Sequence, residues 1–308
     1  MSFAQPSLMP SFTRPASRVA IVRCGSYDLD LSTLLFEALR EFDLPVGGKK
    51  VLLKPNFVEP DPEGIVNTHP AVVGAVREAF LRLGAGSVRV AEGPGHERDS
   101  EAIVETIRLS DFLGPLHDLF VDLNLDEVHA VKLRTHASRL RELYLPGAVL
   151  EADYIVSLPK LKTHHWVGVT LSLKNMFGIV PGCCYGWPKN VLHWAGITPS
   201  ILDINSTVRP DFAIVDGIIG MEGNGPIQGS PKASGVLILG DDPVAVDATG
   251  ARVMGLDPTR IDHLAKAAIL LGHMQAEKIR QLGESVASVK IPFTVLPAFQ
   301  KLVASNGQ

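Results

Sequence analysis

The sequence predicts an α/β fold in which sheets containing parallel strands are flanked by helices and two lobes surround a cleft. Three observations support this fold class. Short β-branched runs alternate with helical patterns from the start of the chain. The same alternation resumes after residue 210. A chain of 308 residues with 46% hydrophobic content is long enough to bury a large core.

In the first third of the chain, strands are expected at 18–24, 50–57 and 87–91, and helices at 31–42 and 69–83. The apolar runs inside the second and third of these strands indicate burial on both faces, as in a parallel sheet. Ligands of open parallel sheets bind beyond the carboxyl ends of the strands. We therefore expect a site near residues 54–57 and 92–96.

The middle of the chain predicts a helix over 100–113, then two segments, 119–123 and 127–133, that alternate like a hairpin or a strand pair. Further strands are expected at 154–158, 212–215 and 235–239, and further helices at 244–254 and 261–271. A charged, turn-rich region at 134–145 indicates a boundary. The predicted organisation is a disordered arm at 1–16, an amino-terminal lobe at 17–145 and a carboxyl-terminal lobe at 146–308.

Composition argues against several classes of function. A net charge of −4 with no block of like charges gives no general attraction to nucleic acid. No apolar run is long enough for a transmembrane helix, so no membrane partner is expected. The 3 cysteines cannot build a disulfide framework, which favours the cytoplasm. We expect a small anionic molecule as the partner, and the sequence leaves a homo-oligomer open.

A cluster of lysines and histidines follows the strand at 154–158 and gives the strongest functional signal. Lys160, Lys162 and His164 alternate with the period of a strand, so their side chains share one face. Lys174 follows an alternating apolar segment, where desolvation can make a lysine a nucleophile or a Schiff-base former. His164 is a candidate acid or base. A solvated edge strand remains the alternative interpretation.

A second candidate region lies beyond the strand at 50–57. Lys54 stands at the strand end, and Thr68 can cap the next helix with Pro70 in its first turn. A capped helix start offers backbone N–H groups and a partial positive charge to an anion. Lys54 and Thr68 are therefore candidate anion-binding residues. An ordinary capping motif explains Thr68 equally well.

Three further signals follow strand ends or lie beside aromatic residues. His96 comes after a glycine-containing turn and is a candidate acid or base. The carboxylates of Asp216 and Glu222 follow a buried strand, where they could bind a hard cation or transfer protons. His193 stands next to Trp194 and is the candidate metal ligand. Asp242 precedes Pro243 and is interpreted as a helix cap.

The order of these motifs resembles the family known as domain of unknown function 362 over residues 18 to 260. The motifs are Lys-Pro-Asn at 54–56, Thr-x-Pro at 68–70, Glu-Gly at 92–93, Pro-Lys-Leu-Lys-Thr-His at 159–164, Leu-Lys-Asn-Met-Phe-Gly at 173–178, Asp-Gly at 216–217, Glu-Gly-x-Gly-Pro at 222–226 and Asp-Pro-Val-Ala-Val-Asp at 242–247. They add Asn56 and Asn175 to the candidate binding residues. Many members carry a ferredoxin-like cysteine cluster, which this sequence lacks, so no iron–sulfur role is implied.

The chain is also distantly similar to the nickel-pincer lactate racemase family. The similarity rests on a Thr-Pro element, a Gly-His segment, a His ten residues before a Lys, and a later His, in that order. It implies that Lys174 anchors a nucleotide-derived cofactor carrying nickel or another divalent metal, and that His193 binds the metal. It also implies that His96 and His164 move protons.

Together the residues predict an enzyme that acts on a small carboxylate or phosphate by lysine- and histidine-mediated acid–base chemistry. Racemisation, isomerisation and elimination are the reaction types that use such groups. Assistance by a metal or a tethered cofactor is open. The alternative is a non-catalytic accessory protein that holds an anionic cofactor or a metal for a partner.

Overall fold

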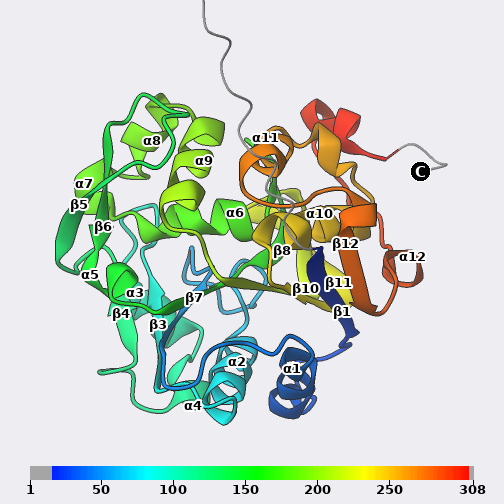
Figure 1. Ribbon diagram of the computed structural model, residues 1–308, viewed down its shortest axis with the longest axis horizontal. Helices are drawn as coiled ribbons and strands as arrows, with labels where there is room; N and C mark the ends of the chain where they lie inside the picture. Colours follow the sequence, from blue (N-terminus) through cyan, green and yellow to red (C-terminus); the bar gives the residue numbers. More distant parts are fainter. Residues whose placement is uncertain (1–15, 305–308) are drawn as a thin grey trace, which may run out of the picture.

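A large, mostly parallel sheet divides the molecule, and helices cover both of its faces (Figure 1). This computed structural model describes residues 16–304, so the arm expected at 1–16 lies almost wholly outside the described residues. The strand order is β12-β1-β11-β10-β7-β2-β3-β4, and β8 and β9 branch from β10. The fold class expected from the sequence is confirmed.

The ten strands of the sheet come from all parts of the described chain. They are β1 (Ser17–Arg23), β2 (Lys50–Pro55), β3 (Ser87–Glu92), β4 (Phe120–Asp122), β7 (Tyr154–Leu158), β8 (Lys160–His164), β9 (Gly168–Thr170), β10 (Phe212–Asn224), β11 (Gln228–Gly240) and β12 (Ile279–Gly283). Parallel pairing joins β10, β7, β2, β3 and β4. Their carboxyl ends therefore reach one edge of the sheet.

Strands from both predicted lobes share this sheet. The strand β1 of the first range pairs with β11 and β12 of the second, and β2 pairs with β7. A separate two-stranded sheet contains β5 (Val128–Lys132) and β6 (Glu142–Pro146).

Two apolar cores lie on opposite faces of the sheet. One face carries α1 (Leu31–Arg40), α2 (Pro70–Arg82), α3 (Ser100–Thr106) and α4 (Ser110–Leu113) (Figure 1). The other core includes α5 (Gly147–Leu150), α6 (Ser172–Asn175), α7 (Gly182–Tyr185), α8 (Asn190–Trp194), α9 (Ile197–Thr207), α10 (Pro243–Val253), α11 (Asp262–Leu270) and α12 (Val286–Val289). Short 3-10 turns occur at η1 (Met176–Ile179), η2 (Pro258–Arg260), η3 (Ala276–Lys278) and η4 (Pro297–Leu302).

Three expectations about secondary structure were wrong. The helix predicted over 100–113 is broken into α3 and α4, because Arg108 adopts a left-handed backbone with φ of 56°. The segments at 119–123 and 127–133 do not pair with each other, since β4 joins β3 and β5 joins β6. The short strands expected at 212–215 and 235–239 are the buried parts of a long hairpin, and the glycine-rich stretch between them continues both strands.

Candidate functional site

A cavity of about 450 Å³ opens at the carboxyl ends of β2 and β3. Its walls come from the segments after those two strands, from β8 through η1, from the start of α8 and from the turn between β10 and β11. This is the edge of the sheet that the strand-end rule selects. Eight candidate residues line the cavity: Lys54, Asn56, His96, Lys162, His164, Lys174, Asn175 and His193.

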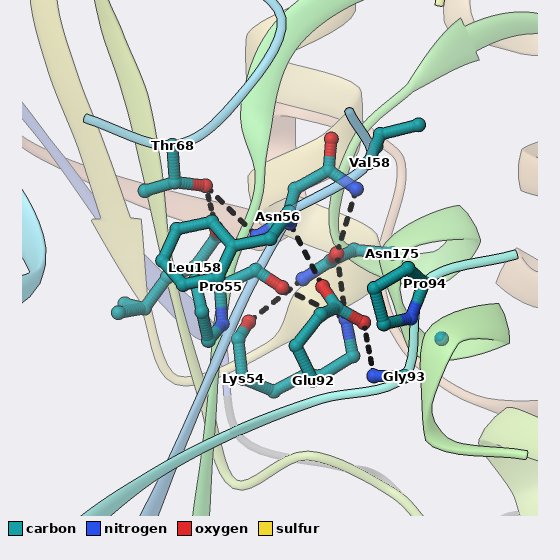
Figure 2. A network of polar contacts seen from close by, with 12 residues as sticks. Lys54, Pro55, Asn56, Val58, Thr68, Glu92, Gly93, Pro94, Leu158 and Asn175 are labelled. Carbon is teal, nitrogen blue, oxygen red and sulfur yellow. Dashed lines mark hydrogen bonds and ion pairs between the residues drawn. The ribbon is translucent and has the colours of Figure 1, made fainter. Parts of the chain in front are cut away.

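The floor of the cavity is a closed network around Lys54 (Figure 2). Lys54 Nζ lies 2.8 Å from Glu92 Oε2 and donates to Asn175 Oδ1 at 3.1 Å. Asn56 donates to the same amide oxygen at 3.2 Å. Gly178 covers the network so closely that a Cβ there would lie 2.6 Å from Lys54 Nζ. The Lys54 ammonium is therefore neutralised and enclosed by the protein itself.

Two further lysines are held by backbone carbonyls. Lys162 Nζ donates to Val66 O at 2.9 Å and to Pro226 O at 3.2 Å. Lys189 Nζ donates to Gly93 O at 2.8 Å, with two more carbonyl acceptors in η1. Burial lowers the pKa of both side chains to about 7. Neither lysine has a carboxylate partner among the described residues.

Lys174 differs from these lysines because its head group has no polar partner. Its Nζ lies 4.2 Å from the centroid of the Phe177 ring and makes no hydrogen bond or ion pair within residues 16–304. The backbone around it is fixed, since Asp247 accepts from Ser172 N at 2.7 Å and from Leu173 N at 2.9 Å. Burial, and then the charge of Lys54, lower the pKa of Lys174 to about 8.

Histidines and a tryptophan form the wall opposite this floor. His164 is buried, and its Nδ1 accepts from Trp166 N at 3.0 Å, so the neutral ring carries its proton on Nε2. His193 packs edge-on against Trp166 with ring centroids 4.9 Å apart. Burial is the largest cause that lowers the pKa of His96, His164 and His193. The neutral form of each ring is therefore favoured, and His164 offers its Nε2 proton as a donor because its Nδ1 is engaged.

Lys160 and Asp216 belong to a second buried cluster and do not line the cavity. Lys160 Nζ lies 3.0 Å from Asp216 Oδ2, and Tyr27 donates to the other carboxylate oxygen at 2.9 Å. The Tyr27 ring stacks on His69 with centroids 3.8 Å apart. Lys160 and Lys162 do share a strand face, because they donate to the carbonyls of Gly64 and Val66 in one loop. The cluster around Asp216 is closed by its own contacts.

The prediction that Thr68 caps α2 was wrong. His69, not Thr68, is the N-cap, and its side chain accepts from Ala71 N at 3.2 Å. Thr68 instead donates to Leu158 O at 2.6 Å and accepts from Asn56 N at 2.9 Å. The anion at this helix start is the carboxylate of Asp216, which accepts from His69 N at 2.9 Å. A protein side chain thus already occupies the predicted anion position.

Glu222 also lies away from the cavity lining. Its carboxylate pairs with Lys232 at 3.1 Å and accepts from Thr294 N at 2.8 Å, both on the long hairpin side of the sheet. Asp242 caps α10, accepting from Val244 N at 2.9 Å, as its sequence position indicated.

A metal site built from protein side chains is not present in residues 16–304. No three His, Cys, Asp or Glu side chains of this part of the chain come together closely enough to hold an ion. His193 Nδ1 lies 3.1 Å from Lys189 O, which engages one ring nitrogen. The racemase resemblance implies a cofactor that brings most of the metal's ligands with it, so the role of His193 as metal ligand stays a prediction.

Sequence reasoning gave no role to Glu92, His165 and Lys189, although all three line the cavity and Glu92 lies in the expected segment 92–96. Glu92 could have been found, because it ends β3 beside the end of β2, where a lysine needs a counter-charge. Lys189 could not, because its left-handed backbone, with φ of 64°, and its carbonyl contacts follow from tertiary packing. No helix among the described residues is long and apolar enough to cross a membrane.

Comparisons with known proteins agree with the family resemblance. The profile described as domain of unknown function (DUF362) matches residues 51–252. A protein of Synechocystis named as thylakoid-associated is 30% identical over 264 residues, which cover 80% of this chain and 77% of that protein.

Two solved structures are more distant. A structural-genomics crystal structure of a protein from Thermotoga maritima has a TM-score of 0.41 at 16% identity, covering 69% of this chain and 55% of that one. The lactate racemase apoprotein from Thermoanaerobacterium thermosaccharolyticum has a TM-score of 0.39 at 14% identity, covering 66% and 50%. The chain thus spans about half the length of these two structures, and likeness at this level assigns no residue a role.

Proposed function

This chain belongs to the family described as domain of unknown function 362, and we propose that it binds a small anion in the cavity and transfers a proton to or from it. The substrate class is a carboxylate or a phosphate. Racemisation, isomerisation and elimination next to a carboxylate are the reactions that this set of groups supports.

The observation that carries the proposal is an imbalance of charge in the cavity wall. Its cationic side chains are Lys54, Arg98, Lys162, Lys174 and Lys189, and its carboxylates are Glu59 and Glu92. Both carboxylates are already paired, Glu92 with Lys54 at 2.8 Å and Glu59 with Arg98 at 2.7 Å. Lys162, Lys174 and Lys189 are left without a counter-ion. A bound anion would supply it and relieve the cost of their desolvation.

The histidines support the proton-transfer part of the proposal. His164 is buried beside this uncompensated charge, and His96 lies at the exposed mouth of the same cavity. In this arrangement His164 donates the proton on its Nε2, and the exposed His96 accepts one. His96 and His164 are therefore the proposed acid–base pair, with Lys162 and Lys174 facing the anion.

The second candidate function is an accessory protein that binds the anion without changing it. The ammonium groups of Lys162 and Lys189, which donate to backbone carbonyls, favour this second function, because a rigid cationic wall is sufficient for holding a ligand. The two functions differ only in whether the histidines transfer a proton.

Calorimetric titration with oxalate and with inorganic phosphate tests the binding step. Incorporation of deuterium from deuterated solvent into a panel of 2-hydroxy and 2-oxo acids, followed by NMR, tests the proton-transfer step. We expect His96→Asn and His164→Asn to abolish exchange while changing the dissociation constant less than about threefold. The exposed His117→Asn is the control and keeps wild-type exchange. Binding without exchange in the wild type would favour the accessory role, and no binding of either anion would refute both.

We also propose that the protein works in the cytoplasm. The described cysteines Cys24, Cys183 and Cys184 are free thiols, which suits a reducing compartment. The name of the thylakoid-associated relative makes attachment to a membrane surface the alternative. Cell fractionation with an antibody to the chain distinguishes the two.

A further inference from the structure

We propose that Lys174 forms an imine with the carbonyl carbon of a 2-oxo acid bound in the cavity. This inference rests on the proposed function, since the same walls must first admit the carboxylate. It goes beyond that function by naming the substrate class and a covalent step.

Polar contacts distinguish Lys174 from every other lysine near the site. The ammonium groups of Lys54 and Lys160 are paired with buried carboxylates at 2.8 and 3.0 Å. Those of Lys162 and Lys189 donate to two and to three carbonyl oxygens. Of the lysines that line the cavity in the described part of the chain, only Lys174 has a head group without a hydrogen bond or an ion pair. Its lone pair is therefore available once the amine is neutral.

The backbone that carries Lys174 is held in place on both sides. Asp247, fully buried, accepts from the N–H groups of Ser172 and Leu173. The side chain of Asn175 donates to Lys54 O at 2.9 Å and to Ser157 Oγ at 3.1 Å. A fixed backbone beneath an unpartnered head group is the arrangement that a positioned nucleophile requires.

Desolvation, and then neighbouring charge, make the neutral amine accessible. Burial and Lys54 lower the pKa of Lys174 to about 8, so that the Lys174 amine is neutral in roughly a tenth of the molecules at pH 7. An ordinary lysine has roughly one neutral amine in a few thousand at that pH.

The covalent step balances without a redox partner. The Lys174 lone pair attacks the carbonyl carbon, a C–N bond forms, and the C=O electron pair moves to oxygen, which takes a proton. The carbinolamine then loses that oxygen as water, its two protons coming from the amine by way of solvent and His164. The products are an imine and one water molecule. The imine draws electrons from the adjacent carbon, which makes its C–H more acidic, in keeping with the proton-transfer chemistry proposed above.

Reductive trapping tests the imine. The full chain is incubated at pH 7 with pyruvate and sodium cyanoborohydride, and the labelled residue is identified by peptide mass mapping. We expect one carboxyethyl group per chain on Lys174, added at least about tenfold faster than on any other lysine. Lys174→Arg should lose this label, and the matched exposed variant Lys278→Arg should keep it. Labelling spread evenly over surface lysines, or unchanged in Lys174→Arg, would overturn the proposal.

Oxalate separates failure of this inference from failure of the proposed function, because it has two carboxylates and no ketone. If oxalate binds the wild type and pyruvate gives no specific label, the imine is refuted and anion binding stands. If neither binds, both are refuted. Cooperative urea unfolding of Lys174→Arg confirms that any loss of label reflects the missing amine and not a missing fold.

Discussion

Lys160 is fully buried and Lys174, a little farther along the chain, is half-buried, and their surroundings differ completely. Lys160 pairs with Asp216 Oδ2 at 3.0 Å, the start of α2 donates to the same oxygen, and Tyr27 donates to the other oxygen of that carboxylate. Lys174 faces a cavity with an aromatic ring beneath it and no counter-ion among the described residues. The comparison teaches that the presence or absence of a counter-ion separates a structural lysine from a chemical one.

Removing the carboxylate of the closed cluster should have the largest effect. Asp216→Asn leaves Lys160 buried without a counter-charge, and it weakens the bonds from Tyr27 and His69 N. We expect the free energy of unfolding in urea to fall by about 3–5 kcal/mol. The exposed Asp118→Asn is the control, with a change below about 0.5 kcal/mol. A loss below about 1 kcal/mol in Asp216→Asn would show that the cluster is not a structural element.

Replacing the two lysines by methionine should give opposite results. Lys160→Met strands the buried Asp216 carboxylate and should cost about 3 kcal/mol in the same unfolding experiment. Lys174→Met removes a desolvated amine that has no polar partner, so stability should stay within about 1 kcal/mol of the wild type or rise. Equal destabilisation of both variants would remove the distinction between the clusters.

The pH dependence of stability should sharpen the same contrast. The folded pKa values of Lys162, Lys174 and Lys189, about 7, 8 and 7, lie below the unfolded value of 10.5. Between these limits the unfolded chain binds more protons, so these lysines make stability rise with pH from about 7 to about 10.

In Lys174→Met this rise should be smaller above pH 8, by up to about 1 kcal/mol per pH unit. Urea unfolding at pH 8 and pH 9.5 measures it. An identical rise in the wild type and the variant would mean that Lys174 titrates as an exposed lysine does.

The smallest expected effect is proton uptake on anion binding. An anion beside the uncompensated lysines raises their pKa values, so at pH 8 the protein should take up as much as about one proton per oxalate bound. Calorimetry in two buffers with different protonation enthalpies measures this number. Lys162→Met removes one of these lysines and should therefore reduce the uptake. Binding without uptake in the wild type would show that the anion sits away from these lysines.

The sequence predicted the parts of the fold that depend on local pattern. The apolar runs of β2, β3 and β7 place these strands in the buried centre of the sheet, and the alternation of Lys160, Lys162 and His164 produces β8. The rule that ligands bind beyond strand ends depends only on topology and could be applied to the sequence. Eight candidate residues do line one cavity.

Features that depend on long-range contacts could not be predicted in this way. Lys160 begins β8 and Asp216 lies within β10, and nothing local shows that they neutralise each other across 56 positions. The hairpin of β10 and β11 contains several glycines and two prolines, whose turn signals hide its length. Thr68 and His69 are both competent caps, and tertiary contacts with Leu158 and Asp216 decide between them.

The pKa of the Lys174 amine tests the central claim most directly. Lysine labelled with 13C at the ε carbon, assigned by comparison with Lys174→Arg, reports the titration of each amine by NMR. The account predicts a midpoint near 8 in the free protein and a higher midpoint with oxalate bound. A midpoint near 10.5, unchanged by oxalate, would contradict it and leave Lys174 as an ordinary solvated side chain.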